Sequence, residues 1–356
     1  MNALRLSCNR FWATVDESLA MNLDLSEPAE AWLVANVDGY HSPGRLEKFS
    51  FGQSNPTYKL SCPGGRFVLR RKPSGQLLPK AHAIEREFRV LKALGGSPIP
   101  IPHVHAYCAD AELVGAPFYV MDFVDGRIFY DQRLPGMTAG ERADIFDAMN
   151  AAIADLHAVA PAALGLGDYG RPEGFMERQV AIWTNQYRAS AGDHIKAMER
   201  LVEWLPEHLP ASQEGRIFHG DLRLDNMMFH PTESRVIALL DWELSTLGDP
   251  IADFAYHAMA WRVPADLFRG FADLDRTAIG IPEESDYVQR YCRRTGRTEL
   301  PDWNYYLAFG FFRVAAILQG VWKRAQTGNA SSIEAEQVGA RAAPLAEIGW
   351  SIAQHC

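Results

Sequence analysis

Hydrophobic residues recur with two different periods along the chain, and the change between them falls near residue 125. Before that point, short apolar runs are separated by turn residues, a pattern typical of strands. The runs expected to form strands are 46–49, 57–60, 66–70 and 118–121. One helix is predicted at 28–37. A second is predicted at 81–94, where Ile84, Phe88, Leu91 and Leu94 follow helical spacing.

After residue 126 the period becomes mainly helical. The predicted helices are 138–158, 173–191, 193–205, 249–261, 303–326 and 332–353. The exception is 216–242, where two apolar runs, 227–229 and 236–240, flank a turn. We therefore expect an α+β fold with a small β-rich lobe and a larger helical lobe. The predicted organisation is an N-terminal extension at 1–24, an N-terminal lobe at 25–125 and a C-terminal lobe at 126–356.

The composition of the chain argues against some classes of function. The chain has 35 Lys and Arg against 44 Asp and Glu, and this net charge of −9 argues against a nucleic-acid binder. The apolar stretch 305–322 contains Arg313 and Gln319, which favours a buried helix over a membrane span. Five cysteines without a C-x-x-C pair indicate reduced thiols, so we expect a cytoplasmic location. No pattern indicates an oligomeric state.

The strongest candidate chemistry lies at His219-Gly220-Asp221, with Asn226 following and Asp241 fifteen residues later. Phosphoryl transfer from ATP needs metal ions on the phosphate oxygens, a base that orients the acceptor, and nearby positive charge. Mg²⁺ prefers hard oxygen ligands such as carboxylate and amide oxygens. Asp221 is thus predicted to orient or deprotonate an acceptor hydroxyl, with Asn226 and Asp241 as Mg²⁺ ligands.

The spacing Asp-x-x-x-x-Asn resembles the catalytic loop of protein kinases, with Arg223 where those enzymes carry a Lys. His-Gly-Asp and Asp-Trp-Glu are similar to the motifs of the aminoglycoside phosphotransferase and choline kinase superfamily. The run 241–250, with Asp253 after it, resembles kinase-like domains found alone in bacteria or attached to acyl-CoA dehydrogenases. The resemblance covers about 25–350. It implies a bilobal protein-kinase-like fold that binds ATP and Mg²⁺ in the N-terminal lobe and carries the catalytic loop and acceptor site in the C-terminal lobe.

In such a fold a basic residue on the third strand contacts the phosphates and pairs with a Glu on the next helix. The resemblance points to Arg70 and Glu87. A guanidinium can bind a phosphate and a carboxylate together, so Arg in place of the usual Lys is chemically sound. Arg71 and Lys72 remain alternatives, as does a solvated basic strand end without a ligand.

Three further predictions follow from the resemblance. Gly52, Ser54 and Asn55 fall where kinases place a phosphate-covering loop, although a plain hairpin turn is the alternative. Asp122 and Val124 fall at the hinge, whose backbone would meet the adenine edge. Asp253 is expected to hold the catalytic loop through hydrogen bonds to backbone amides.

The sequence thus predicts an ATP-dependent phosphotransferase that acts on a hydroxyl of a small molecule. The resemblance to dehydrogenase-linked domains suggests a hydroxyacyl-CoA as acceptor. An aminoglycoside, another hydroxyl metabolite, and a nucleotide-binding pseudokinase module are the alternatives. A protein kinase is disfavoured because no Ala-Pro-Glu segment follows Asp241. Some aromatic residues could line an acceptor pocket, although core packing is favoured: Trp183, Tyr187, Trp204, Trp303, Tyr305, Tyr306, Phe312 and Trp322.

Overall fold

The computed structural model describes residues 23–49, 55–73, 83–190, 194–211, 213–326 and 337–356. The chain divides into two compact units. The sheet unit comprises Met1–Tyr130, Leu164–Leu166 and Leu224–Ser245; the helical unit comprises Asp131–Ala163, Gly167–Arg223 and Thr246–Cys356. Each unit is described by itself.

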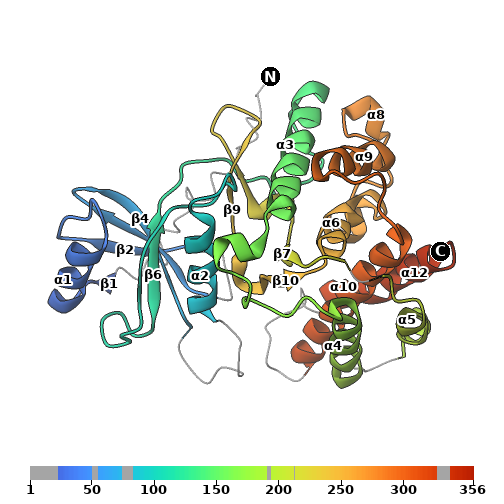
Figure 1. The fold of residues 1–356 in the computed structure, drawn as a ribbon, viewed down its shortest axis with the longest axis horizontal. Coiled ribbons are helices and arrows are strands. Elements are labelled where there is room, and N and C mark those ends of the chain that lie inside the picture. The colour runs from blue at the N-terminus through green and yellow to red at the C-terminus, as the bar shows by residue number, and fades with distance from the viewer. Residues whose placement is uncertain (1–22, 50–54, 74–82, 191–193, 212, 327–336) are drawn as a thin grey trace. The chain divides into compact units, whose positions relative to one another are not determined.

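The sheet unit is built on a six-stranded antiparallel sheet in the order β1-β2-β3-β4-β6-β5 (Figure 1). The strands are β1 (Leu23–Asp24), β2 (Arg45–Lys48), β3 (Thr57–Cys62), β4 (Gly65–Arg71), β5 (Val104–Cys108) and β6 (Phe118–Asp122). Its two helices are α1 (Glu27–Asn36) and α2 (Ile84–Leu94). Ser26 caps α1 by accepting a hydrogen bond from the backbone N–H of Ala29, as expected at a helix start.

Alternation along β4 sends successive side chains to opposite faces of the sheet. Phe67 and Leu69 pack with Leu33 of α1 in one apolar cluster. Arg70 therefore belongs to the other face, where its partner across the ladder is Tyr119 and where Phe88 of α2 packs against the Tyr119 ring. The strand thus directs one guanidinium towards α2.

The hairpin of β8 (Met227–Phe229) and β9 (Val236–Leu239) also belongs to the sheet unit, although it follows about a hundred residues later. Arg127 and Phe229 exchange two backbone hydrogen bonds, and the Leu239 N–H donates to the carbonyl of Pro100. The short 3₁₀ turns η2 (Leu224–Asn226) and η3 (Trp242–Leu244) flank the hairpin. The two compact units therefore differ from the two lobes predicted with a boundary after residue 125, because the hairpin packs with the sheet unit.

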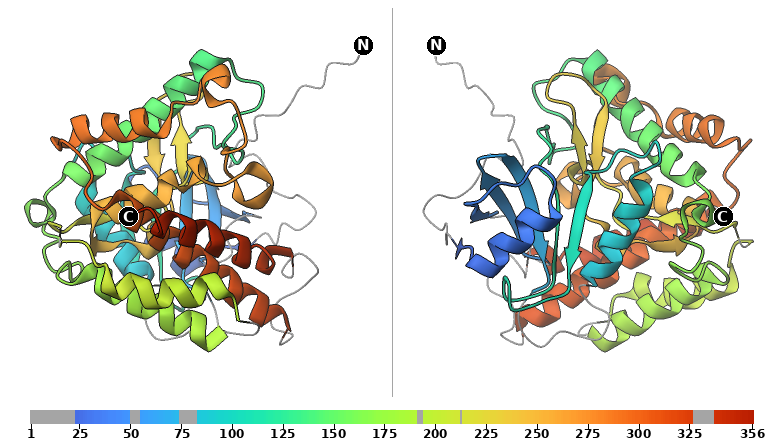
Figure 2. Two further views of the ribbon diagram at one scale, coloured as in Figure 1. Left: turned by 90° about the vertical axis from the view of Figure 1, so that its right-hand side faces the viewer. Right: turned by 60° about the vertical axis from the view of Figure 1, so that its left-hand side comes forward.

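The helical unit is built from nine named α-helices and a two-stranded sheet within its described residues. Its main helices are α3 (Ala139–Ala158), α4 (Phe175–Ser190), α5 (Lys196–Glu207), α6 (Pro250–Ala258), α9 (Glu284–Thr295), α10 (Trp303–Gln326) and α12 (Ala342–Ala353). Shorter elements are η1 (Pro161–Leu164), β7 (Arg216–Phe218), β10 (Thr246–Gly248), η4 (Met259–Trp261), α7 (Ala265–Phe268) and α8 (Arg276–Ile279). Figure 2 shows α12 lying alongside α10.

Helix α10 forms the core of this unit. By length and composition alone its segment Trp303–Lys323 could cross a membrane, but 83% of the apolar window is buried inside the fold. Tyr305, Tyr306 and Phe312 are fully buried there, and Tyr187 is buried on α4. For these aromatic residues the structure confirms core packing.

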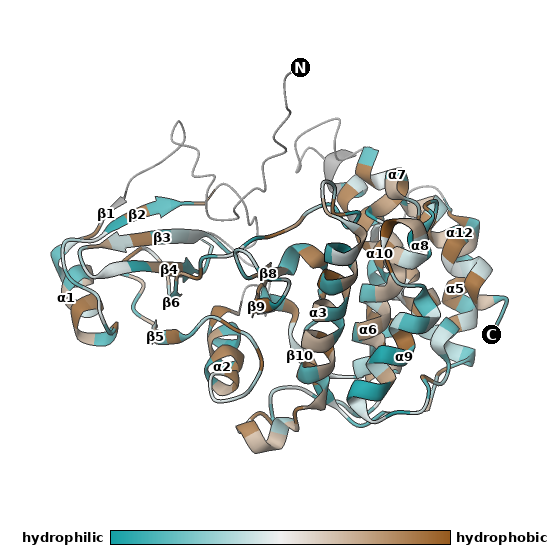
Figure 3. Ribbon diagram, turned by 90° about the horizontal axis from the view of Figure 1, so that it is seen from above, coloured by the Kyte–Doolittle hydropathy of each residue, from teal (hydrophilic) through white to brown (hydrophobic). Residues whose placement is uncertain are grey.

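The helix α9 was not predicted from the sequence. Most of α9 is hydrophilic in colour in Figure 3, and only Tyr287, Tyr291 and Cys292 are buried. Three buried positions are too few to produce a clear helical period. The helix predicted at 249–261 continues after Ala258 as a 3₁₀ turn. Of the helix predicted at 332–353, residues 332–336 lie outside the described residues, and α12 covers Ala342–Ala353.

Candidate active site

The loop after β7 carries the His-Gly-Asp motif of the helical unit. Gly220 has φ = 87°, a left-handed conformation that favours glycine. Asp253 of α6 is fully buried and accepts hydrogen bonds from the backbone N–H groups of His219, at 2.6 Å, and Gly220, at 3.0 Å. The predicted role of Asp253 as the support of this loop is confirmed.

Asp221 is held on both carboxylate oxygens. Nε of Arg223 lies 2.8 Å from Oδ1, and Nη2 of Arg223 donates to Oδ2 at 3.0 Å. The hydroxyl of Tyr256 donates to Oδ1 at 2.9 Å. Burial alone would raise the pKa of Asp221, but Arg223, Tyr256 and His219 lower it below its ordinary value. An ionised carboxylate is therefore available at neutral pH to accept a hydrogen bond from a hydroxyl group.

Tyr256 contacts Asp221 directly and was not identified from the sequence. It lies three positions after Asp253 on α6, so both side chains emerge on the same side of one helical turn. That spacing was the available signal. A tyrosine in an apolar helix nevertheless gives no indication of a charged partner until the loop is packed against it.

In the sheet unit, Arg70 is the basic residue that meets Glu87. Its Nε lies 3.1 Å from Oε2 of Glu87, and its Nη2 donates to Oδ1 of Asp241 at 2.8 Å. Arg71 emerges on the opposite face, where its guanidinium donates to the carbonyl of Val114 and covers the ring of Tyr58. The pairing of Arg70 with Glu87 is confirmed, and Arg71 is excluded as the partner.

Negative charge exceeds positive charge around Arg70. Glu87 is only 2% exposed, and an oxygen of Glu243 lies 3.9 Å from the guanidinium. Burial raises the pKa of Glu87 to about 7; Arg70 opposes this shift, and the carboxylates of Asp241 and Glu243 add to it. Three carboxylates around one guanidinium favour the binding of a further cation.

Asn226 and Asp241 are brought together by the β8–β9 hairpin. Asn226 immediately precedes β8, Asp241 follows soon after β9, and the Leu240 N–H donates to the Asn226 carbonyl at 2.9 Å. Asp241 has φ = 65°, an uncommon conformation for a non-glycine residue and one found preferentially at functional sites.

This donor set fits a metal that is held jointly with a nucleotide. One amide and one carboxylate are hard oxygen donors, and Mg²⁺ bound with phosphates needs only one or two protein carboxylates. The described residues contain no cluster of three or more His, Cys, Asp or Glu that could hold a metal ion by themselves.

The predicted phosphate-covering loop is described only at its end. Gly52 and Ser54 lie outside the described residues. Asn55 is 1% exposed, and neither Oδ1 nor Nδ2 of its side chain has a hydrogen-bond partner within the described part of the chain. A buried amide without partners is costly, so a ligand that supplied them would bind favourably.

At the predicted hinge, Asp122 and Val124 differ. The backbone N–H of Asp122 donates to the carbonyl of His103 at 2.8 Å, and its carboxylate lies 2.8 Å from Nε2 of His105. Val124 packs beside Ile128. Among the hydrogen bonds of the described residues, none uses the Val124 N–H. Val124 therefore retains the backbone donor that an adenine edge requires, whereas Asp122 does not.

A hollow in the helical unit opens beside the two residues that hold Asp221. Its lining contains no Asp or Glu, and it includes two guanidinium groups and an apolar wall. The lining residues are Gln132, Leu222, Arg223, Tyr256, His257, Met259, Ala260, Val263, Phe268 and Arg269. Arg223 is already paired with Asp221, so the apolar side chains are the main feature that this lining offers to a ligand.

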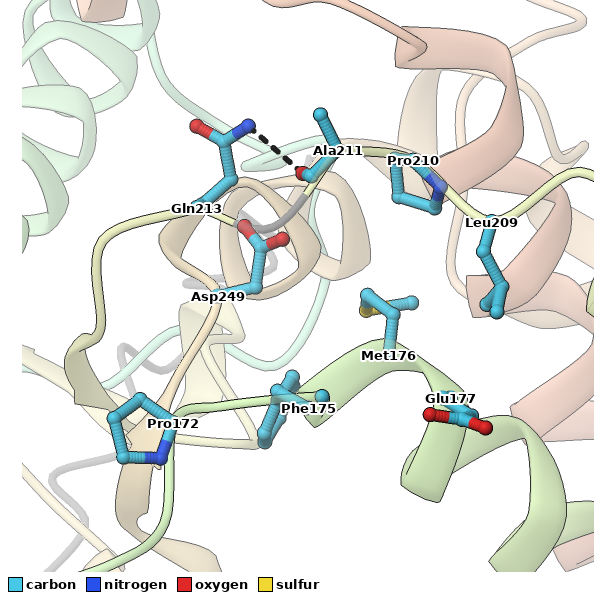
Figure 4. A pocket seen from close by; sticks show the side chains of 10 residues that line it. Pro172, Phe175, Met176, Glu177, Leu209, Pro210, Ala211, Gln213 and Asp249 are labelled. Atoms are coloured by element: carbon cyan, nitrogen blue, oxygen red, sulfur yellow. Dashed lines mark hydrogen bonds between the residues drawn. The ribbon is translucent and has the colours of Figure 1, made fainter.

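A second pocket, of about 120 Å³, lies at the start of α4 (Figure 4). The carboxylate of Asp249 forms part of the pocket wall, opposite Met176 and Leu209. Both oxygens of Asp249 already accept hydrogen bonds, one from the Ile251 N–H of α6 and one from the hydroxyl of Tyr306. Asp249 thus serves as the cap of α6.

The family model described as the phosphotransferase enzyme family matches residues 45–303. Among curated proteins, mouse (Mus musculus) acyl-CoA dehydrogenase family member 10 is 49% identical over 319 residues, covering 88% of this chain and 30% of that protein. Rat (Rattus norvegicus) acyl-CoA dehydrogenase family member 11 is 43% identical over 334 residues, covering 91% and 43%. The chain therefore spans less than half the length of these relatives.

Among solved structures, a Ralstonia eutropha protein named provisionally as an aminoglycoside phosphotransferase is 49% identical, with a TM-score of 0.87 over 93% of this chain and 99% of that one. Choline kinase from Cryptosporidium parvum is 12% identical, with a TM-score of 0.64 over 92% and 96%. These similarities confirm the protein-kinase-like α+β fold class predicted from the sequence.

Proposed function

Because the chain belongs to the phosphotransferase enzyme family, we propose that it transfers the γ-phosphate of ATP to a hydroxyl group of a small molecule. The observation that carries this proposal is that Asp221 is an ionised carboxylate with contacts from Arg223 and Tyr256 to its oxygens. Asp221, Asn226 and Asp241 are a candidate base and two candidate metal ligands, which are groups that phosphoryl transfer requires. A module that only binds nucleotides needs no such base.

In this proposal the nucleotide is bound by groups of the sheet unit. Arg70 would move one hydrogen bond from Asp241 to a phosphate oxygen while it keeps its contact with Glu87. Asn226 and Asp241 would hold Mg²⁺, which neutralises phosphate charge when bound. The side-chain amide of Asn55 and the N–H of Val124 have no hydrogen-bond partner among the described residues. The first would donate to a phosphate and the second to adenine.

Asp221 acts on the acceptor. Its carboxylate accepts the hydrogen bond of the acceptor hydroxyl and directs the oxygen lone pair at the γ-phosphorus. The acceptor O–P bond forms as the bond to the β-phosphate oxygen breaks, giving ADP and a phosphate monoester, while Asp221 takes the proton and passes it to water. A lowered pKa suits this orienting role, because little proton transfer is needed before a loose transition state.

A hydroxyacyl-CoA is the acceptor that we favour. The named relatives are acyl-CoA dehydrogenase family members, and a phosphorylated hydroxyl would be a good leaving group for elimination from an acyl chain. The hollow beside Asp221 agrees with this choice in one respect, because much of its lining is apolar. A polycationic aminoglycoside would instead call for a densely acidic pocket, and the lining of this hollow contains no Asp or Glu.

A phosphotransfer screen tests the proposal. The protein is incubated with Mg–ATP and hydroxyacyl-CoAs, the matching free acids, choline, sugars, aminoglycosides or mixed peptides, and products are identified by ³¹P NMR and mass spectrometry. We expect a phosphorylated acyl-CoA, and none with Asp221→Ala. A phosphorylated aminoglycoside or peptide would overturn the acceptor assignment. Nucleotide binding without transfer to any acceptor would favour the pseudokinase module.

A further inference from the structure

Three side chains from three helices converge behind the Gly220–Asp221 peptide of the helical unit. Tyr256 of α6 donates its hydroxyl to Oδ1 of Asp221 at 2.9 Å. Arg313 of α10 donates from Nη2 to the Gly220 carbonyl at 2.7 Å. The guanidinium carbon of Arg313 lies 5.0 Å from the ring centre of Tyr256 and 5.3 Å from that of Trp183 on α4.

Arg313 is unusual because it is 7% exposed and has no carboxylate partner within the described part of the chain. An isolated buried charge is costly, and here the two aromatic rings and one backbone carbonyl offset that cost. The same guanidinium therefore fixes the ring of Tyr256 and the backbone next to Asp221. Moving either one would disturb the other.

We propose that Tyr256 and Arg313 are positioning residues that fix the carboxylate of Asp221 in the orientation that phosphoryl transfer needs. This inference rests on the proposed function and extends it to two residues outside the catalytic loop. Neither residue needs to touch the phosphate or the acceptor. Tyr256 sets the rotation of the carboxylate together with Arg223 by donating to Oδ1, and Arg313 sets the position of the loop through the Gly220 carbonyl.

The electrostatic surroundings agree with this geometry. Asp221 is faced by Arg223 and His219 from its own loop and by Tyr256 from α6, and Arg313 from α10 lies behind Tyr256. Burial, and then the charge of Asp221, raise the pKa of Tyr256 far above its ordinary value. Tyr256 is thus a protonated hydrogen-bond donor at neutral pH.

Tyr256→Phe is the first test, because it removes only the hydroxyl and keeps the ring under Arg313. ATP turnover is measured with Mg²⁺ and water as the acceptor, so the result does not depend on the natural acceptor. We expect kcat to fall at least about tenfold, the effect of losing a hydrogen bond to a charged group, with KM for ATP within about twofold. The acid limb of the kcat profile should move to higher pH, because Tyr256 no longer favours the ionised carboxylate.

Tyr305→Phe is the matched control. Tyr305 is also buried in the helical unit, and its hydroxyl donates to a backbone carbonyl, that of Leu205, at 3.1 Å. It should lose stability to a similar extent without a change in kcat or in the pH profile. If Tyr305→Phe slowed turnover as much as Tyr256→Phe, the effect would be structural and the positioning role would be wrong.

Arg313→Lys tests the second residue by keeping the charge and removing the planar group between the rings. We expect kcat to fall about tenfold while KM for ATP stays unchanged. Arg200→Lys is its control, since the guanidinium of Arg200 covers the ring of Trp350, at 5.5 Å, away from the loop. Unchanged kcat in Arg313→Lys would remove Arg313 from the proposal.

One further measurement separates this inference from the proposed function. The carboxyl of Asp221 is followed by ¹³C NMR with labelled aspartate and assigned with Asp221→Asn. Tyr256→Phe should raise its pKa, and Tyr305→Phe should leave it unchanged. Wild-type protein that transferred phosphate to no acceptor in the screen would contradict the proposed function, yet this titration would still decide for or against Tyr256. Full turnover with an unchanged titration in Tyr256→Phe would overturn the inference alone.

Discussion

Arg70 and Asp241 lie 171 residues apart in the chain and are joined by a hydrogen bond of 2.8 Å. The contact connects the strand that faces α2 with the residue that follows the β8–β9 hairpin. Arg70 thereby gathers the carboxylates of Glu87 and Asp241 at one point. The proposed metal ligand Asp241 is bound by a guanidinium, and we expect Mg²⁺ to replace that contact when ATP binds.

Replacing Arg70 should lower the free energy of unfolding more than replacing Arg71. We expect Arg70→Met to lower the free energy of unfolding by about 3 kcal/mol, because it leaves the buried Glu87 without its cation. The double variant Arg70→Met/Glu87→Met should recover most of this loss. Arg71→Met, the control, should cost about 1 kcal/mol, since it removes a hydrogen bond to a carbonyl. Urea denaturation measures all three, and equal losses for Arg70→Met and Arg71→Met would contradict the ion-pair interpretation.

Replacing Asp221 by Ala should mainly lower ATP turnover, whereas replacing Asp241 by Ala should mainly lower the affinity for Mg–ATP. Asp221→Ala should lower ATP turnover by more than about a hundredfold and leave Mg–ATP affinity nearly intact, because it removes an orienting base. Asp241→Ala should weaken Mg–ATP binding itself, by at least about tenfold, because it removes a metal ligand. Each variant controls for the other. Calorimetry with and without Mg²⁺, combined with turnover, separates the two effects, and near wild-type turnover in Asp221→Ala would refute the assigned base.

The acid limb of turnover should lie at low pH. The folded-state pKa of Asp221 is lowered, so its carboxylate stays ionised below the ordinary value of about 4. The matching stabilisation is present above the unfolded pKa and is lost as pH falls through the folded pKa. Profiles of kcat should therefore show no titration of Asp221 between about pH 5 and 8. The pKa of Glu87 is raised to about 7, so a decrease in kcat near pH 7 that disappears in Glu87→Gln would come from titration of Glu87. A decrease near pH 7 that persists in Glu87→Gln would contradict the prediction for Asp221.

Asp253 should be essential for the catalytic loop. Asp253→Ala leaves the N–H groups of His219 and Gly220 buried without acceptors, and we expect a loss of about 3 kcal/mol in the free energy of unfolding. Amide hydrogen exchange at those two residues should accelerate. Asp286→Ala, at an exposed position on α9, should change stability by less than about 0.5 kcal/mol. Unchanged exchange in Asp253→Ala would show that the loop is held by other contacts.

The sequence by itself determined the chemical groups and most of the long helices. Asp221, Asn226 and Asp241 could be named because their roles depend on residue type and on short spacing in the chain. The core helix α10 could be found because it is apolar along most of its length, and α3 because its apolar positions recur at helical spacing. These signals are local, so they survive without any knowledge of packing.

The tertiary structure decided which groups meet. Only the alternation of β4, together with its register against β6, directs Arg70 rather than Arg71 towards Glu87. The β8–β9 hairpin joins the sheet unit through backbone hydrogen bonds to residues about a hundred positions earlier. Tyr256 and Arg313 reach the Asp221 loop because α6 and α10 pack behind it. Contacts of this kind depend on the angle and depth at which elements pack, and no local pattern of hydrophobic and polar residues encodes them.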